Sequence, residues 1–150
     1  MVECSSSEVS VYDVISLLGR LGVRVTPQRI IITKIILDNI KCHPSFKQIY
    51  EKVQEELPRV GISTIFNTMK MLTDAGVIKV FEWNGETHID RPDPHINIYC
   101  KDTGNIIDLD DHEEEYLKKI INKLNKNNIN VENLIVIAIA NCEQDYANKP

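Results

Sequence analysis

An asparagine–glycine pair between two extended segments constrains the fold of this chain more than any other feature. Asn84 and Gly85 follow the segment Val77–Trp83, rich in β-branched and aromatic residues, and precede Glu86–Asp90. A two-residue type I′ turn needs positive φ angles at both central residues, and Asn-Gly adopts them at low cost. The sequence therefore predicts a β-hairpin over residues 77–90.

Four helices are predicted before this hairpin, over residues 9–21, 26–39, 45–57 and 63–75. Their apolar residues recur at helical spacing, and their ends carry residues that cap helices. The capping residues are Ser10, Thr26, Ser45 and Gly76. Several short helices followed by a hairpin are typical of a winged helix.

Two prolines in Arg91–Pro94 predict a stiff linker, because proline is excluded from helix interiors and from central strands. Beyond it the chain predicts two strands, a helix and a last strand, over residues 95–100, 105–109, 110–124 and 134–140. The last segment is almost wholly apolar. Such a strand is either buried on both faces or pairs across a subunit interface.

Charge is unevenly distributed over the chain, whose net charge is −5 at pH 7. Residues 1–83 hold 10 Lys+Arg against 9 Asp+Glu, whereas residues 84–150 hold 7 against 13. Only the first part can approach phosphates without strong repulsion. We therefore predict an α+β fold with a winged-helix DNA-binding domain over residues 1–90, a linker over 91–94 and a small α/β domain over 95–150.

The composition predicts a globular protein of the cytoplasm. Hydrophobic residues make up 43% and charged residues 26% of the chain. No apolar run approaches the roughly 20 residues of a membrane span, and the N-terminus lacks the basic and apolar regions of a signal peptide. The four cysteines, at positions 4, 42, 100 and 142, are spaced too widely for a disulfide framework of the kind found in secreted proteins. We expect no membrane partner.

Histidines, carboxylates and one amide gather on both sides of the linker. A single histidine is more often a surface or core residue than a ligand, but several beside carboxylates favour a metal site. Mixed imidazole and carboxylate ligands suit Fe2+, Mn2+ or Zn2+ rather than a thiolate-preferring ion. The residues concerned are His43, His88, Asp90, His95, Asn97 and Asp108.

The order of these motifs resembles the ferric uptake regulator family over about residues 18–145. Its motifs are Gly22–Arg29, His43–Ser45, Ile62–Asn67, Asp74–Ile78 and the spaced residues His95, Cys100, Gly104 and Asp108. The resemblance implies a homodimeric, repressor-like regulator that binds a double-stranded DNA operator. It also implies that residues 95–150 form a dimerisation and metal-sensing domain, with one divalent metal ion per subunit at the hinge.

The resemblance places the DNA contacts on the fourth helix. Ile65, Met69 and Leu72 form its core-facing stripe, and Thr68 is expected to face outward with the polar residues. Relatives usually have tyrosine in place of Phe66 and arginine in place of Asn67, so a hydrogen-bond donor and a positive charge are lost here. The expected DNA-binding residues are Arg24, Ser63, Thr64, Phe66, Asn67 and Lys70. For Phe66 core packing, and for Arg24 and Arg29 a solvated helix face, remain alternatives.

The family's regulatory metal site transfers to five positions of this chain: His43, Asp90, His95, Asn97 and Asp108. Asn97 stands where the family normally has a histidine, and an amide oxygen binds a metal more weakly than imidazole does. His88 lies two residues before Asp90 on the same strand face and is an alternative ligand.

Many relatives hold a structural zinc with two C-x-x-C pairs, of which this chain keeps only the first thiol of each. The lost positions are Thr103 and Asp145, so a four-cysteine zinc site is not expected. Cys100 and Cys142 are left as plain thiols, as a disulfide, or as a two-thiolate site completed by Asp145. We favour plain thiols or a disulfide.

Three other functions are alternatives. The first is a DNA-binding dimer of the same fold that no longer responds to metal, which Asn97 and the lost thiols support. The second is a peroxide or redox sensor, because Asp90 and Asp108 resemble the peroxide-responsive branch of the family. The third is a metalloenzyme, which the absence of a Gly-rich phosphate loop and of H-E-x-x-H disfavours. We predict that the chain is not an enzyme.

Overall fold

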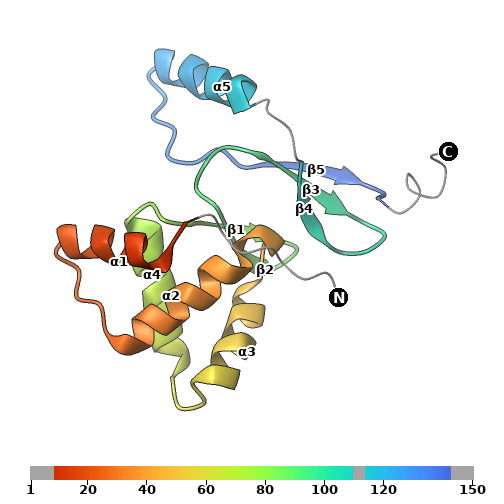
Figure 1. Cartoon of the computed structure of the whole chain (residues 1–150). Coiled ribbons are helices and arrows are strands. Elements are labelled where there is room, and N and C mark those ends of the chain that lie inside the picture. Colours follow the sequence, from red (N-terminus) through yellow and green to blue (C-terminus); the bar gives the residue numbers. More distant parts are fainter. Residues whose placement is uncertain (1–8, 110–113, 143–150) are drawn as a thin grey trace. The chain divides into compact units, whose positions relative to one another are not determined.

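The computed structural model describes residues 9–109 and 114–142, which form two compact units (Figure 1). The first unit ends at Pro92 and the second begins at Asp93. Within these described ranges, no helix is both long and apolar enough to cross a membrane.

The first unit consists of helices followed by a hairpin. Its helices are α1 (Val11–Arg20), α2 (Pro27–Asn39), the short 3-10 helix η1 (Ile40–Cys42), α3 (Phe46–Glu56) and α4 (Ile62–Asp74), and its strands are β1 (Lys79–Trp83) and β2 (Glu86–Asp90). The predicted caps open the helices: Thr26 Oγ1 accepts from the backbone N–H of Arg29, and Ser45 and Gln48 form a reciprocal capping box.

The hairpin turn is the one that the Asn-Gly pair predicts. Asn84 and Gly85 have φ angles of 52° and 77°, and β1 and β2 pair in antiparallel fashion around them. The register pairs Phe81 with His88 and Lys79 with Asp90. The turn therefore decides which residues of the two strands share a face.

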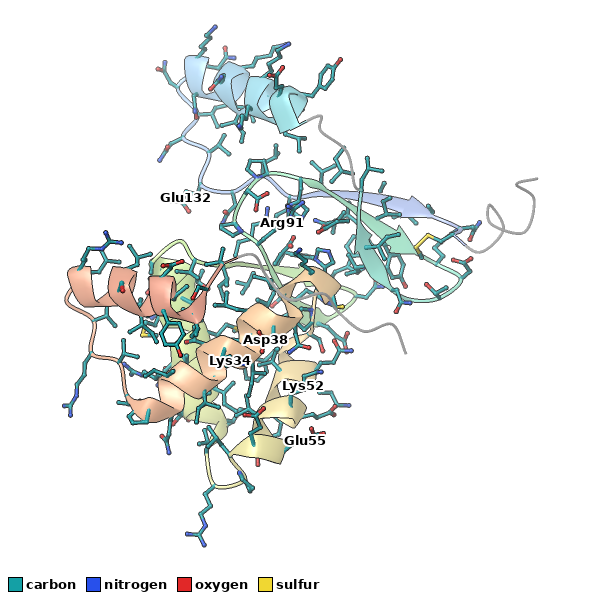
Figure 2. The ribbon with its side chains drawn as sticks, viewed as in Figure 1. Lys34, Asp38, Lys52, Glu55, Arg91 and Glu132 are labelled. Carbon is teal, nitrogen blue, oxygen red and sulfur yellow. A yellow bond between two sulfur atoms is a disulfide. The ribbon has the colours of Figure 1, made fainter. Side chains whose placement is uncertain are left out.

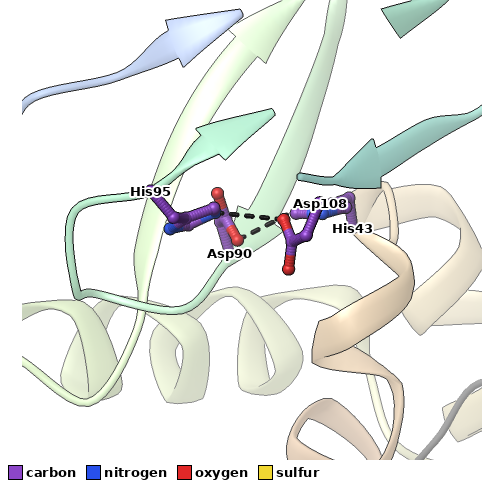
Figure 3. Close-up of side chains that lie close together, drawn as sticks. All are labelled: His43, Asp90, His95 and Asp108. Carbon is purple, nitrogen blue, oxygen red and sulfur yellow. Dashed lines mark ion pairs between the residues drawn. The ribbon is translucent and has the colours of Figure 1, made fainter. Parts of the chain in front are cut away.

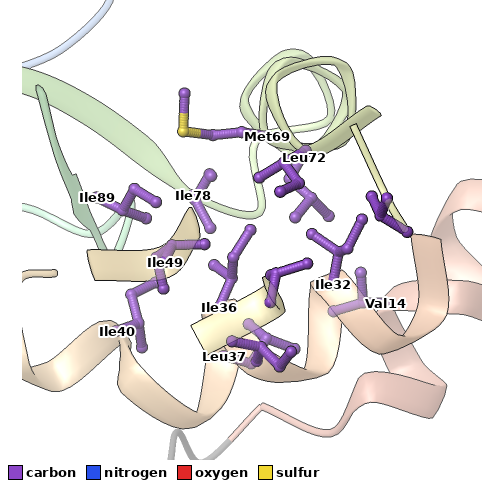
Figure 4. Close-up of a cluster of buried hydrophobic side chains, with 14 of the residues drawn as sticks. Val14, Ile32, Ile36, Leu37, Ile40, Ile49, Met69, Leu72, Ile78 and Ile89 are labelled. Atoms are coloured by element: carbon purple, nitrogen blue, oxygen red, sulfur yellow. The ribbon is translucent and has the colours of Figure 1, made fainter. Parts of the chain in front are cut away.

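The core of the first unit lies between its helices and the hairpin (Figure 4). Ile32 and Ile36 of α2, Ile49 of α3 and Leu72 of α4 are fully buried there, and Ile89 of β2 closes the cluster. All of these side chains are aliphatic, so the framework that carries α4 is held mainly by apolar burial.

The second unit contains a three-stranded sheet and one helix. Its strands are β3 (Ile96–Cys100), β4 (Ile106–Asp108) and β5 (Val136–Ala140), and its helix is α5 (Glu114–Lys126). The order is β4-β3-β5, in which β3 runs antiparallel to β4 and parallel to β5. Among the described residues of one chain, β5 is therefore an edge strand.

Two expectations are corrected, and a third lies outside the described residues. Burial of the last strand on both faces is wrong, because Ile139 is 59% exposed and Ala138 is exposed in a single chain. Thr68 does not face outward: it is fully buried and donates its hydroxyl to the Thr64 carbonyl at 2.7 Å. Residues 110–113, where the fifth helix was expected to begin, lie outside the described residues.

Of the two states favoured for Cys100 and Cys142, plain thiols or a disulfide, the structure has the disulfide. Cys100 at the end of β3 and Cys142 after β5 are joined, with their Cα atoms 5.4 Å apart (Figure 2), and Cys42 is disulfide-bonded as well. Parallel pairing brings the ends of β3 and β5 together, since Cys100 pairs with Ala140. Sequence separation alone does not reveal that proximity.

Candidate functional site

The first unit presents a histidine–carboxylate pair. His43 Nδ1 lies 3.1 Å from Asp90 Oδ1, and both side chains are buried (Figure 3). His43 follows η1, and Asp90 is the last residue of β2. Two segments far apart in sequence thus bring one imidazole and one carboxylate together.

The backbone around His43 explains how this pair is held. His43 has φ 48° and ψ 55°, a left-handed conformation that non-glycine residues adopt rarely. Strand β2 stabilises the turn directly after His43. The Ile89 N–H donates to the Pro44 carbonyl at 2.9 Å, and Ser45 forms a β-bridge with His88. The turn and Asp90 are therefore tied to the same strand.

The second unit presents a second group of candidate ligands. His95 Nε2 lies 3.3 Å from Asp108 Oδ1 (Figure 3). It also lies 3.1 Å from Asn97 Oδ1. Antiparallel register pairs Asn97 of β3 with Asp108 of β4. His95 and Asn97 are buried, while Asp108 is partly exposed.

The other nitrogen of His95 indicates how this group could hold a metal. His95 Nδ1 lies 2.7 Å from the Asp93 carbonyl oxygen, which can only accept, so Nδ1 carries a hydrogen and donates it. This contact orients Nε2 toward the two side-chain oxygens. Metal-binding histidines are commonly oriented through their second nitrogen in this way. The donor set of one imidazole, one carboxylate and one amide oxygen fits a divalent metal ion.

The candidate metal ligands are thus described in both units: His43 and Asp90 in the first, His95, Asn97 and Asp108 in the second. His88, the alternative ligand, has a different contact. Its Nδ1 lies 3.0 Å from the backbone carbonyl oxygen of His43, and its ring stacks on Phe81 with centroids 5.6 Å apart.

Helix α4 presents most of the expected DNA-binding residues to solvent. Ser63, Asn67 and Lys70 are exposed and Thr64 is partly exposed. Phe66 is 52% exposed and Ile62, at the start of the helix, is 57% exposed. Simple core packing of Phe66 is therefore wrong, although its ring touches the edge of Phe46, with centroids 6.3 Å apart.

The two arginines of the Gly22–Arg29 motif differ in their surroundings. Arg24 is exposed. Arg29 is partly buried, and its Nη1 donates to the Arg24 carbonyl oxygen at 2.8 Å and approaches Met71 Sδ. Arg29 thus stabilises the loop before α2, and the side chain of Arg24 is left facing solvent.

Sequence reasoning missed the contact of His88 with His43 and the exposure of Ile62. The first could have been found in part, because a two-residue turn at Asn84-Gly85 dictates that Phe81 lies opposite His88. The exposure of Ile62 has no such signal, because Ile62 lies three residues before Ile65 and so continues the helical spacing of the core stripe.

The model of the ferric uptake regulator family matches residues 20–137 of the chain. The chain belongs to this family. It is 29% identical over 110 residues to the peroxide-responsive repressor PerR of Staphylococcus aureus, a match that covers 72% of this chain and 74% of that protein.

Solved structures of ferric uptake regulators share the fold. The regulator from Pseudomonas aeruginosa, solved with manganese, matches 86% of this chain and 97% of its own, with a TM-score of 0.66 and 21% identity. The regulator from Helicobacter pylori, described with three functional metal-binding sites, matches all of both chains, with a TM-score of 0.66 and 18% identity.

A four-thiolate zinc site, which many ferric uptake regulators hold with two C-x-x-C pairs, does not fit this chain. Cys100 and Cys142 are consumed in a disulfide, and Thr103 has no thiol. Asp145, the other lost position, lies outside the described residues. Asp102 instead accepts from the Cys142 N–H with both carboxylate oxygens, at 3.0 and 3.1 Å. The disulfide and the hydrogen bonds of Asp102 thus link the ends of β3 and β5.

Proposed function

We propose that the chain is a metal-dependent, repressor-like transcription regulator that binds a double-stranded DNA operator as a homodimer. The observation that carries this proposal is a histidine–carboxylate pair in each unit, His43 with Asp90 and His95 with Asp108, on either side of the linker. A regulator that reads DNA in the chromosome acts in the cytoplasm, and we propose no catalytic role for it.

One divalent ion per subunit would be held by His43 and Asp90 from the first unit and by His95, Asn97 and Asp108 from the second. Only five peptide links separate Asp90 from His95, so the distance between their Cα atoms is at most about 18 Å when the chain is fully extended. The two ligand groups are therefore tethered to each other by the chain itself. Fe2+, Mn2+ and Zn2+ all accept imidazole, carboxylate and amide oxygen ligands.

Metal held by both units would favour one relative orientation of the two, and hence one spacing of two recognition helices in a dimer. The ion shifts this equilibrium only by its difference in affinity for the two arrangements. A tenfold difference supplies about 1.4 kcal/mol. The replacement of a family histidine by Asn97 is expected to reduce the metal affinity.

Helix α4 would enter the major groove. Ser63, Asn67 and Lys70 are exposed on it and offer a hydroxyl, an amide and a charge to phosphates and base edges. Phe66 offers an apolar contact to a thymine methyl. Arg24, exposed before α2, would contact the phosphate backbone.

Dimerisation would use the second unit. β5 is an edge strand whose residues Ala138 and Ile139 are exposed in one chain. An exposed apolar edge strand offers both unpaired backbone groups and apolar surface to a second copy. Two-fold pairing of β5 with itself would cover both at once.

Peroxide sensing is the second candidate. The similarity to the Staphylococcus aureus peroxide-responsive repressor favours it, as does the choice of aspartate at positions 90 and 108. In that case bound iron would promote oxidation of a ligand histidine. Mass spectrometry after treatment of the Fe2+-loaded protein with hydrogen peroxide would show the addition of one oxygen atom to a peptide holding His43 or His95. An unmodified peptide would exclude this candidate.

The main test combines metal analysis with DNA binding. Purified protein is assayed for bound metal and for operator binding with Fe2+, Mn2+, Zn2+ or a chelator. We expect one ion per subunit and loss of operator binding in chelator, in His43→Ala and in His95→Ala. His112→Ala, which removes a histidine outside the proposed ligand set, is the matched control. DNA binding that ignores the chelator and both variants would contradict the proposal and favour a metal-independent dimer.

A further inference from the structure

We propose that His88 is a positioning residue of the metal centre, which holds the backbone of His43 without binding the metal itself. The inference rests on the proposed metal function. It arises from one contact, between the imidazole of His88 on β2 and the main chain of the residue that supplies a ligand.

The direction of the contact follows from its chemistry. His88 Nδ1 lies 3.0 Å from the His43 carbonyl oxygen. Because a carbonyl oxygen only accepts hydrogen bonds, Nδ1 must carry a hydrogen and donate it. Nδ1 is thereby occupied with the main chain and has no lone pair for a metal. On the other side of the ring, Nε2 lies 3.8 Å from Oε2 of Glu86, an exposed carboxylate.

The ring is also held from its face. His88 lies opposite Phe81 in the hairpin, and the two rings stack with centroids 5.6 Å apart at an interplanar angle of 23°. Phe81 is buried, so the orientation of the imidazole is set by packing as well as by the hydrogen bond. A ring fixed in this way presents its N–H to one point, the carbonyl of His43.

That carbonyl belongs to the least favourable backbone position of the site. His43 is one of three non-glycine residues in the described part of the chain with a positive φ, and the others lie in loops at Asn84 and Asn128. Asparagine tolerates this region better than histidine does. The His88 hydrogen bond and the Ile89–Pro44 bond are adjacent along β2 and together hold the turn. The imidazole of His43 is thereby directed to Asp90.

Loss of a residue that only orients a ligand leaves the ligand set intact but lowers the metal affinity, commonly by about ten- to a hundredfold. Loss of a ligand changes the coordination itself. Binding of Co2+ distinguishes loss of an orienting residue from loss of a ligand. The visible absorption bands of bound Co2+ report the number and kind of ligands, and competition with a chelator measures its affinity.

Two variants of His88 make the test specific. His88→Phe keeps an aromatic ring against Phe81 and removes the N–H donor, whereas His88→Asn keeps an N–H at a similar distance from the backbone. We expect His88→Phe to bind one Co2+ with the wild-type spectrum and at least about tenfold lower affinity. We expect His88→Asn to recover most of that affinity. His43→Ala, with a changed spectrum, is the ligand-loss control.

A third measurement does not depend on metal. In metal-free protein, hydrogen exchange of the Ile89 amide, which is bonded to Pro44, should accelerate in His88→Phe and return toward wild type in His88→Asn. Similar thermal midpoints of the two variants would show that the difference in affinity is not a loss of folding.

Three results would overturn the inference. A His88→Phe spectrum that changes as that of His43→Ala does would make His88 a ligand. An unchanged affinity in His88→Phe, with wild-type protein binding Co2+ normally, would make it an ordinary packing residue. Wild-type protein that binds no Co2+ would remove the proposed metal function first, and this inference with it.

Discussion

The two units are stabilised in different ways. The first contains a cluster of 15 buried hydrophobic residues. In the second, the described residues include three buried hydrophobic side chains, Cys100, Ile106 and Leu117, and seven large hydrophobic side chains that are exposed. These seven are Ile107, Leu109, Tyr116, Ile120, Ile129, Ile135 and Ile139. Among the described residues, the buried hydrophobic side chains of the first unit outnumber its five exposed ones, whereas in the second unit the exposed hydrophobic side chains outnumber the buried ones.

This contrast matches the separate tasks proposed for the units. A DNA-reading helix needs a rigid support, and burial of side chains such as Leu72 and Ile65 supplies it. A dimerisation unit needs apolar surface that a second copy covers. The Cys100–Cys142 disulfide adds a covalent restraint where the apolar core of a single chain is small.

The largest expected effect is on association through the second unit. In a two-fold dimer Ile139 occurs twice, and its loss from a buried interface removes about 1.5–3 kcal/mol for each copy. We expect Ile139→Asp to be monomeric by sedimentation at micromolar concentration. Ile62→Asp is the matched control, because Ile62 is equally exposed but belongs to the first unit. A dimeric Ile139→Asp would place the interface elsewhere.

The disulfide should stabilise the second unit and leave the first unchanged. Cys100 and Cys142 are 42 residues apart, and closing a loop of that length stabilises a fold by about 4 kcal/mol in the chain-entropy model. We expect the Cys100→Ser/Cys142→Ser variant to lose stability by that order in circular dichroism.

The unfolding midpoint reported by Trp83 fluorescence serves as the internal comparison, because Trp83 is the only tryptophan and lies in the first unit. This midpoint should be the same in the Cys100→Ser/Cys142→Ser variant as in the wild type. A double variant as stable as the wild type in circular dichroism would contradict a stabilising role of the disulfide.

A substitution in the core of the first unit should destabilise that unit without affecting association through the second. Leu72 is fully buried, and a leucine-to-alanine change at such a site costs about 2–5 kcal/mol. We expect Leu72→Ala to lower the denaturant midpoint of Trp83 fluorescence and to leave dimerisation unaffected. Leu21→Ala, at a leucine that is 56% exposed, should change the free energy of unfolding by less than about 0.5 kcal/mol. Equal effects of the two variants would contradict the assigned core.

Local rules predicted the first unit better than the second. Capping residues such as Thr26 and Ser45 and the Asn-Gly turn act over two to four residues, so the sequence states them directly. The Cys100–Cys142 bond depends on parallel pairing of β3 with β5, which joins segments about 40 residues apart. Parallel register leaves no comparable local signal.

The candidate site shows the same limit. The chemistry of the ligands was evident from residue types, and the placement of His95 beside Asn97 follows from strand geometry. The left-handed backbone of His43 and the contact of His88 with its carbonyl depend on η1 meeting β2. Thr68 was misassigned because its hydroxyl bonds to the helix backbone, which allows a polar residue to be buried.

The smallest expected effect concerns the proposed DNA-reading face of the first unit, where α4 exposes an apolar pair beside its polar residues. Ile62 and Phe66 are one helical turn apart and are 57% and 52% exposed. An apolar contact reads thymine through its C5 methyl group. Replacing one contacted thymine by uracil removes that methyl alone, which should cost about 0.8 kcal/mol, or about fourfold in Kd. In Phe66→Ala the same replacement should have no effect, whereas Asn67→Ala, which keeps the ring, should retain the fourfold difference. Uracil operators bound as tightly as thymine operators by the wild type would show that the exposed ring packs against something other than the bases.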